Sequence, residues 1–313
     1  KPLDFVNKEF DPSMIKDLQA EWIPFDFKNQ NIDDFLENLN IDKTVEISSI
    51  QGGYSNAIKQ LNKFIEVGYQ DYAKYRSDPS KEASSQLSPY FHSGQISTHE
   101  VFDKISELES WSPESINPKM VGRREGWWGS TENFESFMDE LITWRELGYH
   151  TCVRRANYNQ YSSLPEWAIK TLHEHSSDER EHIYSLDELT YSQTHDEIWN
   201  AAQNQLRTQG VIQNYLRLWW GKKILEWTPN PQIALSYMIT LNDRYSLDGR
   251  DPNSYSGVFW ILGRYDRAWG PERSIFGKIR YMTSDSTARK FNLKPYLEKW
   301  GNESLGVSTS ISK

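Results

Sequence analysis

Apolar residues in this 313-residue chain recur at three- and four-residue spacing, and this helical period limits the possible folds more than any other feature. The period is clear in residues 54–76, returns in residues 134–144, and runs through 211–227 until Pro229. No stretch alternates between apolar and polar residues, as a half-buried strand would. The sequence therefore predicts an all-α fold with long ordered loops.

The chain divides into two parts at residue 50. Residues 1–50 are acidic and carry prolines that break long helices, so we expect an irregular lead-in segment. Residues 51–313 are expected to form the helical domain, with the Gly- and Pro-rich residues 107–130 as an irregular insertion. The stretch from Thr194 to Glu197 has the form of a capping box, which predicts a helix that starts with Thr194 as its N-cap.

Composition excludes several classes of protein. The formal charge is −9, the mean hydropathy is −0.75 and 14% of the residues are aromatic. No apolar run approaches the roughly 18 residues of a membrane-spanning helix, so no membrane is expected. Cys152 stands alone, which fits a reducing interior and predicts a cytoplasmic protein. The acidic excess is not typical of nucleic-acid binding, but residues 251–313 hold ten Lys and Arg against six Asp and Glu and are therefore +4.

Short catalytic and metal-binding motifs give no assignment. The sequence contains no GxGxxG after a strand, no GxxxxGK[ST], no GxSxG and no HExxH, which excludes the commonest nucleotide, esterase and zinc-protease sites. On a helix, His173 and His175 would point roughly 200° apart, so they would not share a metal. Residues 248–253 have the composition of a calcium loop, but Arg250 occupies a required ligand position. We therefore expect no metal.

The tryptophans allow two interpretations. Trp220 and Trp227 are seven residues apart on one predicted helix, hence on the same face and about 10 Å apart along its axis. An electron can pass between indoles at that range, and Trp199 on the preceding helix would extend the pair to a chain of three. The same residues could also pack a hydrophobic core. A chain of three has a use only beside a redox cofactor.

Five stretches of the sequence carry a resemblance to a known family. They are 87–97 (LSPYFHSGQIS), 194–203 (THDEIWNAAQ), 220–227 (WGKKILEW), 241–253 (LNDRYSLDGRDPN) and 276–282 (FGKIRYM). In this order they resemble the FAD-binding domain of class II cyclobutane pyrimidine dimer photolyases, which belong to the photolyase/cryptochrome family. The resemblance spans roughly residues 55–300 and implies the helical FAD-binding fold of that family.

The resemblance implies light-dependent DNA repair, in which an electron from photoexcited, reduced FAD splits a flipped-out pyrimidine dimer into two pyrimidines. Serine hydroxyls would hold the pyrophosphate, Arg217 would pair with Asp248, and Asn242 would lie beside flavin N5. For Arg76 and Asp266 an ordinary structural ion pair is the alternative. The residues implied to bind FAD are Tyr72, Arg76, Ser84, Ser85, Leu87, Ser88, Gln95, Asn214, Arg217, Asn242, Asp248, Asp251 and Asp266.

The resemblance also assigns residues to the substrate and to electron transfer. Two tryptophans would stack on the dimer, a carboxyl would hydrogen-bond it, and a loop would intrude where the dimer leaves the duplex. The substrate residues are Trp144, Trp260, Glu140, Leu218, Arg267 and Trp269. The implied catalytic set is Trp220, Trp199, Trp227, Asn242 and Glu140.

The sequence departs from the class II pattern at several positions. Ile212-Gln213-Asn214 replaces the usual Met-His-Gly, Leu218 replaces a lesion-contacting Met, and Ser93 replaces a Phe. These changes leave the lesion type open, and a cryptochrome-like blue-light photoreceptor or another photolyase-like flavoprotein without repair activity is the alternative. We expect this chain to lack the family's amino-terminal antenna domain, and therefore we expect no antenna chromophore on it. We expect a DNA-associated monomer whose partner is UV-damaged DNA.

Overall fold

The computed structural model describes residues 31–123 and 125–302. Within these ranges the regular secondary structure is helical and no strand forms, although Arg273 and Gly277 make an isolated β-bridge. The prediction of an all-α fold is confirmed. Contacts divide the chain into a first unit, Lys1–Val45, and a second unit, Glu46–Lys313.

The first unit contains helix α2 (Ile32–Asn38) in the part that the structure describes. Asn31 is its N-cap, and the Asn31 side chain accepts a hydrogen bond from the backbone N–H of Asp33 at 2.9 Å. Asp33 and Asp34 lie in the first turn, where the positive end of the helix dipole stabilises their negative charges. The expectation of an irregular lead-in therefore missed α2, and for residues 1–30 it lies outside the described residues.

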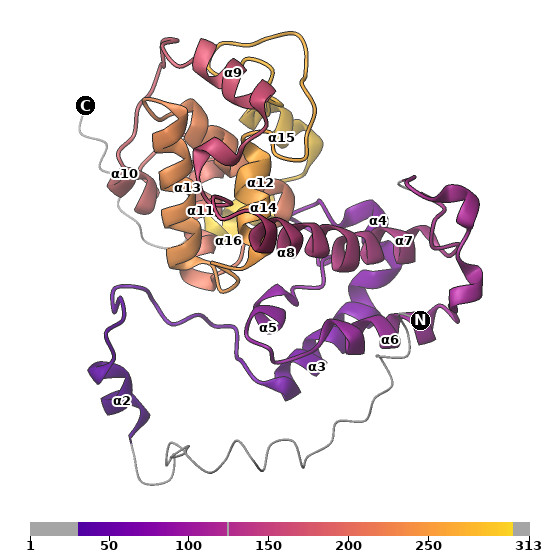
Figure 1. The fold of residues 1–313 in the computed structure, drawn as a ribbon. Helices are drawn as coiled ribbons and strands as arrows, with labels where there is room; N and C mark the ends of the chain where they lie inside the picture. The colour runs from indigo at the N-terminus through magenta and orange to yellow at the C-terminus, as the bar shows by residue number, and fades with distance from the viewer. Residues whose placement is uncertain (1–30, 124, 303–313) are drawn as a thin grey trace. The chain divides into compact units, whose positions relative to one another are not determined.

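The described part of the second unit is a succession of helices (Figure 1). The α-helices are α3 (Tyr54–Lys63), α4 (Tyr72–Tyr75), α5 (Ser88–His92), α6 (Thr98–Leu108), α7 (Glu132–Met138), α8 (Arg145–Arg154), α9 (Glu166–Glu174), α10 (Leu186–Thr190), α11 (Glu197–Gln209), α12 (Asn214–Glu226), α13 (Pro231–Tyr245), α14 (Pro252–Ile261), α15 (Ser284–Lys290) and α16 (Lys294–Trp300). The 3-10 turns are η3 (Tyr69–Asp71), η4 (Pro113–Ser115), η5 (Pro118–Met120) and η7 (Tyr161–Ser163), and the π-helical turns are η2 (Phe64–Gly68) and η6 (Asp139–Trp144).

The helix predicted for residues 54–76 forms as the consecutive segments α3, η2, η3 and α4. Gly68 lies where the π turn changes to a 3-10 turn, and a Cβ there would be 2.7 Å from the carbonyl oxygen of Glu82. The rings of Phe64 and Tyr72 pack edge to face, with 5.7 Å between centroids. With apolar side chains of α5, α6 and α7 they form a core cluster.

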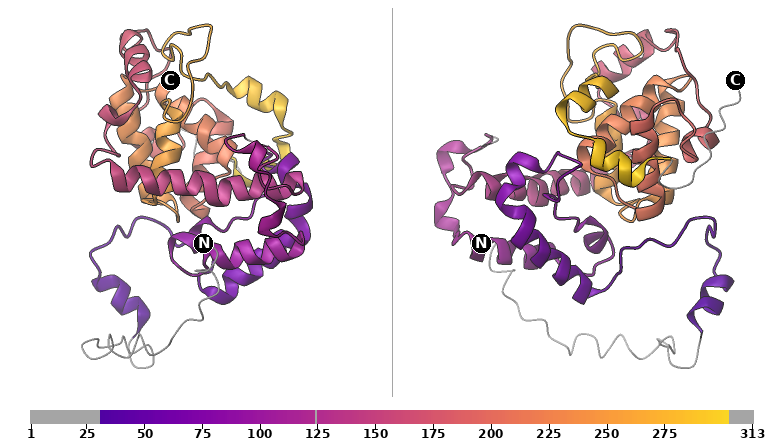
Figure 2. Two further views of the ribbon diagram at one scale, coloured as in Figure 1. Left: turned by 45° about the vertical axis from the view of Figure 1, so that its right-hand side comes forward. Right: turned by 180° about the vertical axis from the view of Figure 1, so that it is seen from behind.

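Helices α7, η6 and α8 follow one another without a break from Glu132 to Arg154. Figures 1 and 2 show this magenta segment reaching from the purple helices α3–α6 to the orange helices α11–α14. At Gly148 it approaches α14 so closely that a Cβ would lie 2.8 Å from Asn253 Oδ1 and 2.9 Å from Ser256 Oγ. A larger residue at this position would push α8 away from α14.

Helices α11–α14 enclose the largest buried side chains among the residues that the structure describes. The buried tryptophans here are Trp199, Trp219, Trp220 and Trp227. Gly221 lets α12 approach its neighbours, because a Cβ there would lie 2.2 Å from Ile261 Cδ1 and 2.9 Å from Met238 Sδ. Indole rings therefore fill the core of this bundle, and Gly221 allows α12 to lie close to its neighbours.

The start of α11 differs from the predicted one. Asp196 is the N-cap, and its Oδ1 accepts hydrogen bonds from the backbone N–H groups of Ile198 and Trp199, each at 3.0 Å. Thr194 instead donates its hydroxyl to Asn200 Oδ1 at 2.8 Å. The prediction of Thr194 as N-cap is wrong, because the carboxylate directly before the helix takes the free N–H groups.

The predicted insertion begins with residues 107 and 108 in the last turn of α6, and residues 109–130, apart from residue 124, form short 3-10 turns and bends. The indole N–H of Trp111 donates to the carbonyl oxygen of Trp128 at 2.7 Å, and the Trp111 ring stacks on Phe134 with 5.4 Å between centroids. Glu135 accepts the backbone N–H of Gly129 at 3.0 Å. The segment is therefore tied to α7 by aromatic packing and by backbone hydrogen bonds.

Two features are absent from the residues that the structure describes, namely a membrane-spanning helix and a metal-binding group. No helix there is both long enough and apolar enough to cross a membrane. No group of three or more His, Cys, Asp or Glu side chains is arranged to hold a metal ion in the same residues.

Candidate functional site

A partly buried charge pair lies where α12 meets the loop after α13. Arg217 Nη1, one turn into α12, is 3.4 Å from Asp248 Oδ1 and 3.4 Å from Asn242 Oδ1. Asn242, near the end of α13, is 2% exposed. Ser246 donates its hydroxyl to Asp248. The pairing of Arg217 with Asp248 that the resemblance implied is present in the structure.

The environment of Asp248 keeps its carboxyl ionised. Burial by itself would raise the pKa of Asp248, but the Arg217 guanidinium and the hydroxyls of Ser246 and Ser88 outweigh burial and hold this pKa below its usual value. The site therefore contains a fixed anion, a fixed cation and the Asn242 amide. Together they offer both donors and acceptors to a polar heteroaromatic ring.

The segment that contains α5 contacts this charge pair. The hydroxyl of Ser88, the first residue of α5, bonds to Asp248. At the other end of α5, His92 Nδ1 is 3.4 Å from Asp251 Oδ2. Asp251 is also the N-cap of α14. The structure thus brings α5 against the loop between α13 and α14.

The other residues that the resemblance assigned to FAD differ in how far they can reach a ligand. Tyr72 and Leu87 are 6% and 0% exposed and belong to the core cluster, so their side chains stabilise the fold. Gln95 Oε1 accepts the backbone N–H of Gly53 at 2.8 Å, before the start of α3. Ser84, Ser85 and Gln95 are partly exposed, and Asn214 is exposed.

Arg76 and Asp266 do not pair with each other. Arg76 bonds to Glu140. Asp266 accepts the indole N–H of Trp269 at 3.1 Å and forms an ion pair with Arg280 at 3.2 Å. The interpretation of Arg76 and Asp266 as an ion pair is wrong, because each has a different opposite charge or donor at hand. Asp266 thus lies among the residues predicted to face DNA.

Two cations lie close to the Trp269 ring. The guanidinium carbon of Arg267 is 4.5 Å from the centroid of the Trp269 ring, and that of Arg280 is 4.4 Å from it. These are cation–π distances. Leu218, the remaining residue assigned to the lesion, is partly exposed on α12.

Trp144 and Trp260 form an aromatic platform at the contact of α8 and α14. Their ring centroids are 4.5 Å apart, and the Tyr265 ring is 6.4 Å from Trp144 and 6.5 Å from Trp260. Both tryptophans are partly exposed. The indole N–H of Trp144 donates to Asp139 at 2.9 Å and not to Glu140, because the π turn η6 places residue 139 one turn before residue 144.

Trp220, Trp199 and Trp227 form a continuous chain of indoles. The rings of Trp220 and Trp199 are 6.3 Å apart and nearly parallel, at 4°, and those of Trp199 and Trp227 are 5.7 Å apart. The indole N–H of Trp199 donates to the carbonyl oxygen of Trp220 at 3.1 Å, and that of Trp220 donates to Gln203 Oε1 at 2.9 Å. Trp199 is thus the middle residue, and Trp220 lies one helical turn beyond Arg217.

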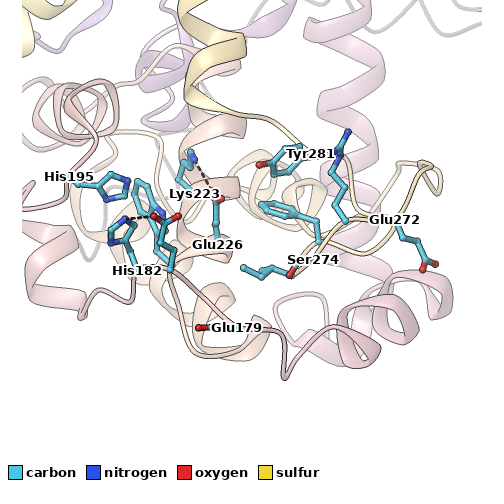
Figure 3. A pocket seen from close by; sticks show the side chains of 13 residues that line it. Glu179, His182, His195, Lys223, Glu226, Glu272, Ser274 and Tyr281 are labelled. Carbon is cyan, nitrogen blue, oxygen red and sulfur yellow. Dashed lines mark hydrogen bonds and ion pairs between the residues drawn. The ribbon is translucent and has the colours of Figure 1, made fainter.

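The Trp227 end of this chain lines a cavity of about 580 Å³, called here the acidic cavity. Figure 3 shows His182 and His195 close together beside the paired Lys223 and Glu226. The Trp227 ring is 5.2 Å from the His195 ring. The glutamates that line the cavity are Glu179, Glu181, Glu226 and Glu272.

Several residues of these sites had no role in the sequence analysis. Tyr184 packs on Trp227 with 5.5 Å between centroids, and its hydroxyl lies 2.7 Å from His195 Nδ1. Tyr265 completes the platform, and Asp139 holds Trp144. His195 lies inside one of the family stretches and could have been found there. The other three lie outside these stretches and carry no spacing signal.

Sequence comparison finds relatives named deoxyribodipyrimidine photo-lyase, whereas no family model matches the chain. The protein of Methanothermobacter thermautotrophicus is 36% identical over 301 residues, which are 93% of this chain and 62% of the relative. That of Potorous tridactylus is 38% identical over 83% of this chain and 46% of its own length. That of Arabidopsis thaliana is 40% identical over 75% of this chain and 44% of its own. The chain thus spans between two-fifths and two-thirds of these relatives.

Solved structures share the fold at low sequence identity. A class III photolyase from Agrobacterium tumefaciens superposes with a TM-score of 0.60 at 16% identity, covering 87% of this chain and 50% of that chain. A Synechocystis cryptochrome superposes with a TM-score of 0.58 at 14% identity, covering 84% and 48%. The fold prediction is confirmed, and the sequence relatives and the fold together place this chain in the photolyase/cryptochrome family, as its helical domain.

Proposed function

We propose that this chain carries out light-dependent repair of UV-damaged DNA, as a deoxyribodipyrimidine photo-lyase. The observation that carries the proposal is the partly exposed Trp144–Trp260 platform in the same unit as the buried Trp220–Trp199–Trp227 chain. A tryptophan chain alone would equally suit a photoreceptor. An aromatic platform adds a surface on which unstacked bases can lie.

FAD is the cofactor that the residues fit. Arg217, Asn242 and Asp248 provide a largely buried donor and acceptor set suited to a flavin ring, in which Arg217 and Asp248 keep some exposure and Arg217 Nη1 lies 3.4 Å from Asn242 Oδ1. The hydroxyls of Ser84, Ser85 and Ser88 would hold the pyrophosphate, with Asp251 near the ribose. The solved photolyase of Sulfolobus tokodaii, which shares the fold with a TM-score of 0.54, contains two FAD molecules. Bound in reduced form, FAD supplies the light-driven electron.

The platform would receive the lesion. A pyrimidine dimer must leave the duplex before chemistry can reach it, and the open position is then filled or supported by protein. Trp144 and Trp260 would stack on the flipped bases, while Arg267 and Trp269 would occupy the gap. The guanidinium groups of Arg267 and Arg280 lie close to the Trp269 ring and would hold it in this position. Glu140, held by Arg76, would accept a hydrogen bond from the dimer.

The tryptophan chain would deliver electrons to the cofactor site. Electrons would enter at Trp227 from a reductant in solution and pass through Trp199 to Trp220. The direct contacts between these rings, 5.7 Å and 6.3 Å between centroids, make each step short. This supply restores the reduced form that repair requires and takes no part in dimer splitting.

The experiment that tests the proposal uses protein loaded with FAD and reduced, given a duplex with one cyclobutane thymine dimer. Blue light should restore two thymines, read by absorbance and by chromatography, and darkness should not. Replacement of Trp144 and Trp260 by Ala should abolish repair while the flavin spectrum stays unchanged. Normal binding of the damaged duplex without repair in light would overturn the proposal and favour a photoreceptor.

A further inference from the structure

A second cavity beside the platform has a strongly basic lining. It measures about 380 Å³ and lies between the carboxyl end of α8, the η7 turn and the segment after α14; we call it the arginine cavity. Arg154, Arg155 and Arg264 line it, together with His150, and no Asp or Glu does. The proposals above use none of these residues.

Arg264 is buried without an anion. It is 4% exposed, and its Nη2 donates to the carbonyl oxygen of Tyr158 at 2.7 Å and to the hydroxyl of Ser163. Its Nε has no hydrogen-bond partner within residues 31–123 and 125–302. Burial lowers the pKa of Arg264 to about 10, and the positive charge of Arg155 adds to this shift. The Arg264 guanidinium also lies over the Phe259 ring, with 3.8 Å from its carbon to the ring centroid. Neutral acceptors and an aromatic face compensate a buried guanidinium less completely than an anion would.

The neighbouring arginines are also free to bind an anion. Arg155 Nη1 donates to the carbonyl oxygen of Ser163 at 3.2 Å, and Arg154 is exposed without a partner among the described residues. One cation at the end of α8 is explained by the helix dipole. The dipole does not explain three guanidinium groups around one cavity, since like charges repel.

Tyr265 joins this cavity to the platform. Its ring packs against both Trp144 and Trp260, and its hydroxyl bonds to Thr151 on the cavity wall. A nucleotide stacked on the platform would therefore have its backbone within reach of the arginines. Tyrosine and threonine hydroxyls are further donors to phosphate oxygens.

We propose that the arginine cavity binds a backbone phosphate of the DNA strand next to the nucleotide held on the Trp144–Trp260 platform. The inference rests on the proposed function and adds the place where the strand is anchored. Planar guanidinium groups match the paired oxygens of a phosphodiester, and a single such contact fixes the register of the strand without reading its sequence.

The test measures binding of a dimer-containing duplex and of an undamaged duplex by fluorescence anisotropy at several salt concentrations. The variant is Arg154→Gln with Arg155→Gln, and the matched control is Lys59→Gln with Lys104→Gln, which removes the same charge from exposed positions on α3 and α6. The arginine variant should lose about tenfold in affinity, and its slope of log K against log salt should fall by about one, as expected for one lost phosphate contact. The control should change neither.

A neutral methylphosphonate placed at one phosphate at a time around the dimer identifies the contact. One position should weaken binding of the unchanged protein and have no further effect on the arginine variant. The same scan on the unchanged protein alone keeps the test valid if the variant fails to fold. If no phosphate position matters, or the variant binds DNA normally, the inference is wrong even though repair proceeds.

Inorganic phosphate and thymidine monophosphate separate the two sources of a phosphate group. If either raises the melting temperature of the unchanged protein but not of the arginine variant, and DNA affinity is equal in both, the cavity serves free phosphate and the DNA assignment is overturned. If the unchanged protein binds neither damaged nor undamaged DNA, the proposed function itself fails.

Discussion

The acidic cavity and the arginine cavity both lie beside tryptophans, but they differ in charge and in how the tryptophans are held. In the acidic cavity Trp227 is 2% exposed and is packed by His195 and Tyr184. Beside the arginine cavity, Trp144 and Trp260 are partly exposed, and Tyr265 forms the shared wall. Under the proposed function, tryptophan would serve two purposes in this chain, and the surroundings of each ring would set which one.

Charge separates these purposes. Four glutamates line the acidic cavity against Lys223 and Arg273, so the lining has a net negative charge that repels phosphate, although Lys223 itself lies 5.4 Å from the Trp227 ring. Guanidinium groups beside the platform attract phosphate. The DNA strand and the electron entry point would therefore be kept apart on the same unit by electrostatics.

Breaking the tryptophan chain should have the largest effect. We expect Trp220→Phe to slow photoreduction of the bound flavin at least about a hundredfold, equivalent to about 2.7 kcal/mol in the barrier. Chemically reduced Trp220→Phe protein should still repair DNA. Trp219→Phe is the control, since Trp219 is equally buried on α12 but lies outside the chain. Equal slowing in both variants would show that packing, and not the chain, is responsible.

Removing one ring of the platform should have the next largest effect. Trp144→Ala should lower the affinity for dimer-containing DNA about tenfold, because stacking of one base contributes about 1–3 kcal/mol. Trp144→Phe keeps a ring and should lose less. The measurement is anisotropy with damaged and undamaged duplexes, and an equal loss for both would argue against a lesion-specific role.

Removing acidic charge should have a smaller effect on the electron entry point. Glu179→Gln with Glu181→Gln should speed photoreduction by an anionic reductant about two- to threefold at low salt, since repulsion is reduced. The rate with a neutral reductant should stay the same and serves as the control. A gain that persists at high salt would contradict an electrostatic cause.

The smallest expected effect is on the pH dependence of the melting temperature. Burial, and then the neighbouring His182 and Lys223, lower the pKa of His195, whereas Asp196 and Glu181 oppose this shift. A lowered folded-state pKa means that His195 contributes stability above its unfolded pKa of about 6.5, and that this stability is lost as the pH falls. The melting temperature of His195→Gln should therefore fall less on acidification than that of the unchanged protein. His173→Gln, which removes an exposed histidine on α9 and leaves His195 and its contacts in place, should retain the pH dependence of the unchanged protein.

Sequence reasoning predicted the elements better than their contacts. The helical period located residues 54–76 and α12, but it could not show that Gly68 packs on Glu82 and that the helix changes to π and 3-10 turns there. A regular helix puts Glu140 before Trp144, and the π turn η6 replaces it by Asp139. Local hydrogen bonds that break the helical period are set by packing from elsewhere in the chain.

For the site too, sequence reasoning identified residues better than the contacts that those residues make. Spacing indicated a Trp220–Trp227 pair, but only the fold shows Trp199 between them. The resemblance assigned Arg76 and Asp266, yet their partners, Glu140 and Arg280, come from distant segments. The arginine cavity could not be predicted, because its residues gather from three segments with no motif in common.

The parallel stacking of Trp199 on Trp220 has an optical consequence. Two indoles held at 4° with 6.3 Å between centroids couple their electronic transitions. We therefore expect a signed pair of bands in the near-ultraviolet circular dichroism of the folded chain, lost in Trp199→Phe. The Trp199–Trp220 pair can therefore be followed by circular dichroism before any flavin is added.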